Sequence, residues 1–119
     1  KYARETARKV ENPNSEVLFA PLKNYSLNGS DWKWYDISGL ANVEDVNLLI
    51  IDGPPEDIQK EARFPALPLL LEKLSDKAVI ILDDTNRPDE QATIQKWKAA
   101  YNLKEQYLFT EKGTTILYR

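Results

Sequence analysis

Three aspartates follow two apolar runs, at positions where a parallel sheet would expose side chains able to do chemistry. Asp52 follows the run 46–51, and Asp83 and Asp84 follow the run 78–82. Ligands of open α/β sheets bind beyond the carboxyl ends of such strands. Three carboxylates there would repel one another unless a cation, a proton or an arginine compensates, and hard oxygen ligands suit Mg²⁺ or Ca²⁺. The structural alternative of helix caps and solvated acids is favoured for Asp84, whereas for Asp52 the two readings are even.

Two arginines are the nearest candidates to compensate these acids. Arg63 and Arg87 each lie just ahead of a predicted helix and close to the acids in sequence. They could orient Asp52 or Asp83, or bind an anionic substrate. Surface arginines need no function, and this bland alternative is slightly favoured for each.

An aromatic cluster is the third candidate. Trp32, Trp34 and Tyr35 stand together in a segment that we expect to be a loop. They could stack on a planar ligand such as adenine. Packing over one end of the sheet as a satellite core is the favoured alternative. Trp97 lies on a helical apolar stripe and is expected in the core.

Composition excludes several classes of function. Sixteen Lys and Arg against nineteen Asp and Glu give a net charge of −3, without the basic surplus that nucleic-acid binding needs. The apolar runs are far shorter than the roughly 20 residues of a membrane helix. The sequence holds no Cys and no His, which excludes disulfides, thiol catalysis and sulfur-bound zinc and leaves acid–base chemistry to carboxylates, Lys or Tyr. We expect one soluble, cytoplasmic domain over residues 1–119 that binds neither nucleic acid nor membranes.

The elements that position these residues follow from periodicity. We predict a helix over 2–11, a strand over 17–20 and a polar, turn-rich stretch over 23–43. Strands 46–51 and 78–82 follow, then a final hairpin; the helices between these strands begin near Pro65 and Pro88. The chain has no Met and starts at Lys1 inside the first helix, so we expect a processed, proteolysed or engineered beginning.

The two central strands are apolar almost throughout, which is typical of parallel strands covered by helices on both faces. The 31 residues from Asp52 to Asp83 fit one strand–helix–strand unit. The final hairpin would add an antiparallel edge. The predicted fold class is therefore three-layer α/β with a mostly parallel sheet.

These segments carry a family resemblance in their order along the chain. The stretch Val46 to Pro55 (VNLLIIDGPP), then ARFPALP from Ala62, then ILDD from Ile81, with Arg87 and Trp97, resembles the C-terminal half of a class I S-adenosylmethionine-dependent methyltransferase. It is most similar to the small-molecule O-methyltransferase group. The resemblance implies a Rossmann-like sheet without its N-terminal strands, S-adenosylmethionine as cofactor and a small-molecule acceptor.

The resemblance also assigns roles to residues. Asp52 and Asp83 would be catalytic, and Arg63 and Arg87 would bind substrate. In metal-dependent relatives these strand ends hold a cation such as Mg²⁺, for which Asp52, Asp83 and Asp84 match by type. The relatives' basic Lys is replaced by Pro55, and the Gly-x-Gly turn and the ribose-binding acid of the family are absent. The cofactor wall would be formed by Ala20, Pro21, Leu22, Asp52, Gly53 and Pro54.

Three functions stay open. The first is methyl transfer in the complete protein, with this chain a partial domain that is inactive alone. The second is a non-catalytic α/β interaction module that has lost the cofactor site. The third is a nucleotide-hydrolase fragment, because 48–52 also resembles a Walker B strand; it is the weakest, since the chain has no Gly-Lys-Ser/Thr loop.

One edge of the predicted sheet should be covered. In the family, the strand matching 46–51 is central, and nothing in this run protects an open edge. We expect the cover to be Val17–Ala20, a second copy of the chain, or an N-terminal fragment.

Overall fold

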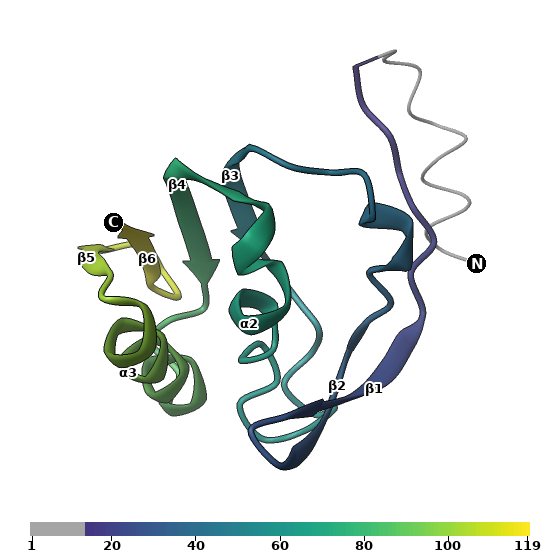
Figure 1. Cartoon of the computed structure of the whole chain (residues 1–119). Helices are drawn as coiled ribbons and strands as arrows, with labels where there is room; N and C mark the ends of the chain where they lie inside the picture. The colour runs from purple at the N-terminus through teal and green to yellow at the C-terminus, as the bar shows by residue number, and fades with distance from the viewer. Residues whose placement is uncertain (1–13) are drawn as a thin grey trace.

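A computed structural model describes residues 14–119, which form two β-sheets and a set of helices (Figure 1). The helix predicted over 2–11 lies outside the described residues. The smaller sheet is an antiparallel hairpin of β1 (Leu22–Leu27) and β2 (Ser30–Tyr35). The expected loop over this stretch is wrong. Asn28 and Gly29 both adopt positive φ (53° and 80°), as a two-residue hairpin turn of an Asn-Gly pair requires.

The larger sheet has four strands in the order β3-β4-β6-β5. They are β3 (Val46–Ile51), β4 (Leu74–Asp83), β5 (Lys104–Leu108) and β6 (Thr114–Tyr118). The predicted parallel pairing of β3 with β4 and the predicted final hairpin are both confirmed. The expectation of a mostly parallel sheet is wrong, because β6 pairs antiparallel with β4 as well as with β5. The last strand, β6, lies between β5 and β4, and both of its pairings are antiparallel. Antiparallel pairs therefore outnumber the single parallel pair of β3 with β4.

Three helical segments connect the strands. After the short 3₁₀ turn η1 (Ser38–Leu40), helix α2 (Ala66–Leu70) continues as a second 3₁₀ turn, η2 (Leu71–Lys73). Helix α3 (Pro88–Tyr101) begins with Pro in its first turn, followed by Asp89 and Glu90 at its positive end, as predicted. It ends at Asn102 in the left-handed conformation. Helix α2 is shorter than the apolar run that contains it, because β4 already starts at Leu74, which pairs with Val46.

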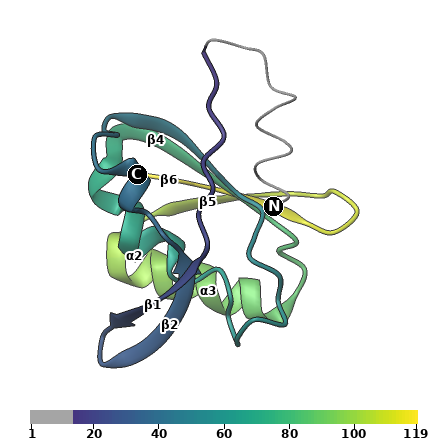
Figure 2. The ribbon, with the colours of Figure 1, turned by 90° about the vertical axis from the view of Figure 1, so that its right-hand side faces the viewer.

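The core lies between the helices and one face of the larger sheet. Trp97 is fully buried there, as predicted, and its indole Nε1 donates a hydrogen bond to the Phe64 carbonyl at 3.0 Å. Figure 2 shows both α2 and α3 on the same side of strands β4, β5 and β6. The remaining core residues come from both layers: Ile51, Ile80, Leu82 and Leu117 from the strands, Ala66, Leu67 and Ile94 from the helices, with Trp34 and Leu103.

The opposite face of the larger sheet is open at β3. Leu48 and Ile50 are 53% and 62% exposed, and no helix in residues 14–119 covers them. The three-layer expectation is therefore wrong for the described chain, which has helices on one face. Val17–Ala20 was expected to be a buried strand and is not one: it makes no strand pairing, and Leu18 and Phe19 are 41% and 51% exposed.

Hydrogen bonds and an aromatic contact hold the hairpin to the loop between β3 and α2. The Lys33 amide donates to Gln59 Oε1 at 2.8 Å, and Gln59 Nε2 donates to the Lys33 carbonyl at 2.7 Å. Nearby, the rings of Trp32 and Phe64 pack at 4.8 Å. These contacts fix β2 beside the carboxyl end of β3. In the described part of the chain, no helix has the length and apolarity to span a membrane.

Candidate functional site

The three aspartates meet at one edge of the sheet. Asp52 follows β3, Asp83 ends β4, and Asp84 comes next in the chain. One carboxylate oxygen from each can be chosen so that all three lie within 4.8 Å of one another. Asp52 is exposed, and the other two are half-buried. The prediction that the two parallel strands bring Asp52 and Asp83 together is confirmed, because a single crossover sets both carboxyl ends on the same side.

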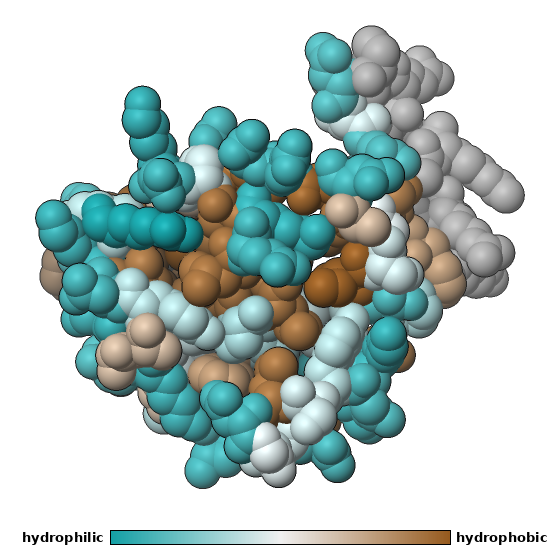
Figure 3. Space-filling view, viewed as in Figure 1, coloured by the Kyte–Doolittle hydropathy of each residue, from teal (hydrophilic) through white to brown (hydrophobic). Residues whose placement is uncertain are grey.

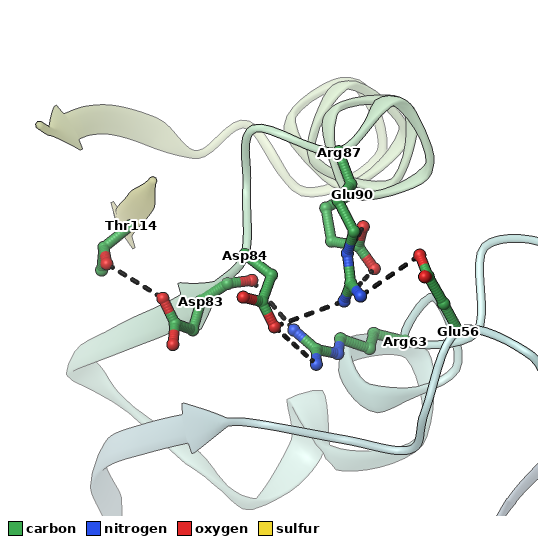
Figure 4. Close-up of polar contacts among 7 residues, drawn as sticks. All are labelled: Glu56, Arg63, Asp83, Asp84, Arg87, Glu90 and Thr114. Atoms are coloured by element: carbon green, nitrogen blue, oxygen red, sulfur yellow. Dashed lines mark hydrogen bonds and ion pairs between the residues drawn. The ribbon is translucent and has the colours of Figure 1, made fainter. Parts of the chain in front are cut away.

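Asp84 is compensated by a buried arginine. The Arg63 guanidinium, whose side chain is 5% exposed, pairs with Asp84 Oδ2 at 3.2 Å and donates to the Asp83 carbonyl at 2.9 Å. Figure 4 shows Arg63 reaching Asp84 from the opposite side to Asp83. Asp84 also adopts a positive φ of 59°, which turns the chain from β4 toward α3. Asp84 is therefore neither the helix cap nor the solvated acid expected from the sequence, but the ion-pair partner of a buried arginine.

Arg87 is the centre of a second charge cluster (Figure 4). It pairs with Glu90 at 2.9 Å, Glu56 at 3.2 Å and Asp84 at 3.4 Å. Burial lowers the pKa of Arg87, but Glu90, Asp84 and Glu56 outweigh it and raise the pKa above the ordinary value, so the guanidinium stays charged. Both arginines thus bind Asp84 and stabilise the loop around it. Their predicted role in substrate binding stays a prediction.

Asp83 is oriented from the neighbouring strand. The Thr114 hydroxyl on β6 donates to Asp83 Oδ1 at 3.2 Å, and it lies 3.0 Å from the Thr110 hydroxyl. Because a hydroxyl carries no charge, this contact orients the Asp83 carboxylate without neutralising it. Asp52 and Asp83 together provide oxygen ligands of the kind that Mg²⁺ and Ca²⁺ take. The three carboxylates therefore fit a divalent cation, with Asp84 already sharing its charge with two arginines.

A cavity of about 560 Å³ lies beside the carboxyl end of β3. Three of the residues predicted to form the cofactor wall, Ala20, Asp52 and Gly53, line it. The others, Pro21, Leu22 and Pro54, are their chain neighbours but are not lining residues. Figure 3 shows apolar side chains gathered near the centre of the molecule, with a hollow to their right. The cavity's apolar lining includes Leu18, Trp34, Ile37, Leu40, Leu49, Ile51 and Leu70.

Tyr35 stands at the acidic end of this cavity. Its hydroxyl lies so close to Gly53 that a Cβ on that glycine would be 2.6 Å from it. Burial raises the pKa of the Tyr35 hydroxyl, Arg63 lowers it, and Asp52 raises it, with the net shift upward. The side chain is therefore a neutral hydrogen-bonding group at pH 7. Its ring also packs edge-on against Trp34, with centroids 5.1 Å apart.

Sequence reasoning found the aromatic cluster but placed its members differently. Trp32 packs on Phe64, and Trp34 is 5% exposed in the core while also lining the cavity. Packing in the core is thus confirmed for Trp34, and stacking on a planar ligand stays a prediction. The cavity residues Asp36 to Leu40 were missed. The sequence signal for the hairpin that leads into this segment is the Asn28-Gly29 pair, followed by tryptophans at the alternate positions 32 and 34.

Asp36 contributes a further charge to the cavity wall. The Ser38 backbone amide donates to Asp36 Oδ1 at 2.9 Å, and this bond, with help from the Ser38 side chain, holds the pKa of Asp36 below its usual range. The cavity therefore combines an aromatic and aliphatic interior with carboxylates at its rim. Such a lining suits a flat, partly apolar ligand that carries hydroxyl or cationic groups. No protein-family model, curated protein sequence or solved structure matches this chain.

Proposed function

We propose that this chain is part of an S-adenosylmethionine-dependent methyltransferase that acts on a hydroxyl of a small molecule. One observation carries the proposal: an apolar cavity with an aromatic wall opens at Asp52 and Gly53, next to the strand end that supplies Asp83. The sequence resemblance over 46–87 points to the same chemistry. In the proposed arrangement, Trp34 and Tyr35 contact the adenosyl group, and Asp52 and Gly53 lie under the reacting end.

The chain's own residues supply positioning and proton handling in this proposal. When bound, S-adenosylmethionine supplies an electrophilic methyl group for in-line displacement. The apolar lining excludes water from the reacting atoms. The cavity walls hold the two reactants in the orientation that the displacement needs. Asp52 or Asp83 takes the proton of the acceptor hydroxyl, or both hold a divalent cation that lowers the pKa of that hydroxyl.

The same proposal predicts weak cofactor binding by these 119 residues alone. The sequence lacks the Gly-x-Gly turn and the second-strand acid by which the family holds methionine and ribose. A cavity that lacks those contacts must still offset the entropy of association. We expect a Kd weaker than micromolar for S-adenosylhomocysteine, and calorimetry that gives micromolar or tighter binding would refute this part.

A titration with millimolar S-adenosylhomocysteine, followed by amide NMR, tests where the ligand binds. We expect shifts at Gly53 and Ile37, which line the cavity, and none at Gln95, which lines a different cavity beside α3. Gly53→Ala should abolish the shift at Ile37. A titration without shifts near the cavity, or with shifts centred on Gln95, would refute the proposed function.

The cation is tested separately. Titration with Mn²⁺ should broaden the amide signals of Asp52 and Asp83 at lower metal concentrations than those of Asp76, an exposed acid near the opposite end of β4. Asp52→Asn should weaken this broadening several-fold. Equal broadening at all three positions would argue against a metal site.

The interaction module is a second candidate because Leu48 and Ile50, two large apolar residues in the middle of β3, are 53% and 62% exposed. The residues encoded upstream of Lys1 discriminate the candidates. A strand followed by Gly-x-Gly supports the methyltransferase, a start codon immediately before Lys1 supports the module, and a Gly-Lys-Ser/Thr loop would revive the hydrolase.

A further inference from the structure

Gly53 lies at the acidic end of the cavity, and its backbone φ does not by itself call for a glycine. It does not share the positive φ of Gly29 and Gly113 (80° and 79°), where an L side chain would be strained. A Cβ at Gly53 would nevertheless fall 2.6 Å from the Tyr35 hydroxyl, which is closer than two such atoms pack. The missing side chain of Gly53 therefore leaves the space that the Tyr35 hydroxyl occupies.

The Tyr35 side chain is held in place, yet its hydroxyl has no partner in the protein. The ring packs edge-on against the buried Trp34, and the Tyr35 carbonyl accepts a hydrogen bond from the Tyr25 hydroxyl at 2.9 Å. The Tyr35 hydroxyl itself makes no hydrogen bond to any residue among 14–119. A phenol carries one proton that it can donate. The fold thus fixes a donor at the cavity's acidic end and leaves it available to a ligand.

The Asp52 carboxylate beside this hydroxyl has the opposite hydrogen-bonding character. Both residues line the cavity, and they are close enough that Asp52, after burial and against Arg63, contributes to the raised pKa of the Tyr35 hydroxyl. An ionised carboxylate only accepts hydrogen bonds, whereas a neutral phenol donates one. A ligand group that accepts from Tyr35 and donates to Asp52 is a hydroxyl. An ammonium group, which cannot accept, satisfies only Asp52.

We propose that the Tyr35 hydroxyl donates a hydrogen bond to the oxygen of the acceptor hydroxyl and thereby turns the acceptor's proton toward Asp52. This assignment rests on the methyl transfer proposed above and names the residue that orients the acceptor. In this arrangement the Tyr35 ring flanks the adenosyl group, and its hydroxyl lies at the reacting end beside Gly53. Tyr35 keeps its own proton, so its role is orientation and not proton transfer.

Phenol and toluene test this hydrogen bond without the cofactor, because they differ only in a hydroxyl against a methyl group. Each compound is titrated into the full chain, and the amide NMR shifts of Gly53 and Ile37, which line the cavity, give its Kd. Tyr35→Phe should weaken phenol binding about three- to tenfold, the effect of one lost hydrogen bond, and leave toluene binding unchanged. A change in the shape of the cavity would instead weaken both compounds.

Tyr118→Phe is the matched control. Tyr118 is 37% exposed against 36% for Tyr35, so each substitution removes one partly exposed phenolic hydroxyl. Tyr118 lies on β6 and does not line this cavity. Its substitution should change neither the Kd of phenol nor that of toluene. The ratio of the two Kd values should therefore respond to Tyr35→Phe alone.

Three results would overturn the assignment of Tyr35. They are a phenol-to-toluene ratio that Tyr35→Phe leaves unchanged, an equal response to Tyr118→Phe, and phenol that shifts neither Gly53 nor Ile37 in the unmodified chain. The titration with S-adenosylhomocysteine tests the methyltransferase separately. If that titration succeeds and the phenol ratio does not change, only the role of Tyr35 is wrong. If it fails while the phenol ratio changes as expected, methyl transfer is wrong and Tyr35 still binds a ligand hydroxyl.

Discussion

Replacement of Arg63 by Met should destabilise the protein by about 3 kcal/mol. The change leaves the Asp83 carbonyl without its donor, at a cost of about 1–3 kcal/mol for a buried acceptor. It also removes the closer of two arginines from Asp84. Breaking a buried ion pair costs about 3–5 kcal/mol, but this share is smaller here because Asp84 is 17% exposed and keeps Arg87 at 3.4 Å. Arg63 Nε is buried without a hydrogen-bond partner among residues 14–119, so its loss offsets part of the penalty.

Urea unfolding measures this cost. With an m-value of about 1–3 kcal/mol/M, the midpoint should fall by roughly 1–3 M. Lys98→Met is the control, because it breaks an ion pair with Glu105 whose side chains are 33% and 29% exposed, and it should cost less than about 1 kcal/mol. Adding Asp84→Asn to Arg63→Met should recover part of the stability, since the carboxylate that has lost its closer arginine is then replaced by a neutral amide. The reasoning fails if Arg63→Met costs no more than Lys98→Met, or if the second substitution recovers nothing.

Three further outcomes are expected. Gly53→Ala should cost about 1 kcal/mol, because its Cβ would fall 2.6 Å from the Tyr35 hydroxyl, and much less in a Tyr35→Phe background; a double-mutant cycle by urea unfolding without coupling would contradict this contact. Trp97→Phe should cost about 2–4 kcal/mol in thermal or urea unfolding, since the smaller ring leaves a void and the Phe64 carbonyl loses its donor at 3.0 Å. Burial raises the pKa of Tyr35 and of Tyr101 above the ordinary value of about 10, so their contribution to stability is fully present below pH 10 and is lost as pH rises through the folded-state pKa. Tyr101→Phe should reduce the loss of stability above about pH 10, and an unchanged alkaline profile would argue against that shift.

The parts of the fold that sequence predicts correctly are those with strong local signals. The apolar runs around Leu49 and Ile80 define β3 and β4, and the single crossover between them makes the pair parallel. Proline and acids define the start of α3, and the turn before Gly113 defines the final hairpin. These features depend on residues close together in the chain, so one sequence is enough to read them.

The missed features depend on distant partners. The hairpin β1–β2 has polar strands that alternate weakly, so the Asn28-Gly29 signal was overlooked. An apolar strand such as β3 is compatible with helices on both faces or on one, and the sequence cannot tell which segments fill the second face. The proximity of Asp52 and Asp83 was predicted correctly, because the parallel pairing of β3 with β4 is enough to place both residues at the same edge of the sheet. The pairing of Arg63 with Asp84 required the loop geometry between β3 and α2, which no local pattern encodes.

The double hydrogen bond between the Gln59 side chain and the Lys33 backbone makes two walls of the cavity move together. The Gln59 side-chain amide pairs with the Lys33 backbone as a neighbouring strand would, through one accepted and one donated hydrogen bond. It thereby connects β2, which carries Trp34 and Tyr35, to the loop that follows Asp52. A displacement of that loop by a ligand at Asp52 is transmitted to the aromatic wall through this amide and through the contact between Trp32 and Phe64. Because the Lys33 amide proton is held by Gln59, its exchange with solvent reports each detachment of the loop from the hairpin. The exchange rate of the Lys33 amide proton would therefore measure how often the cavity opens.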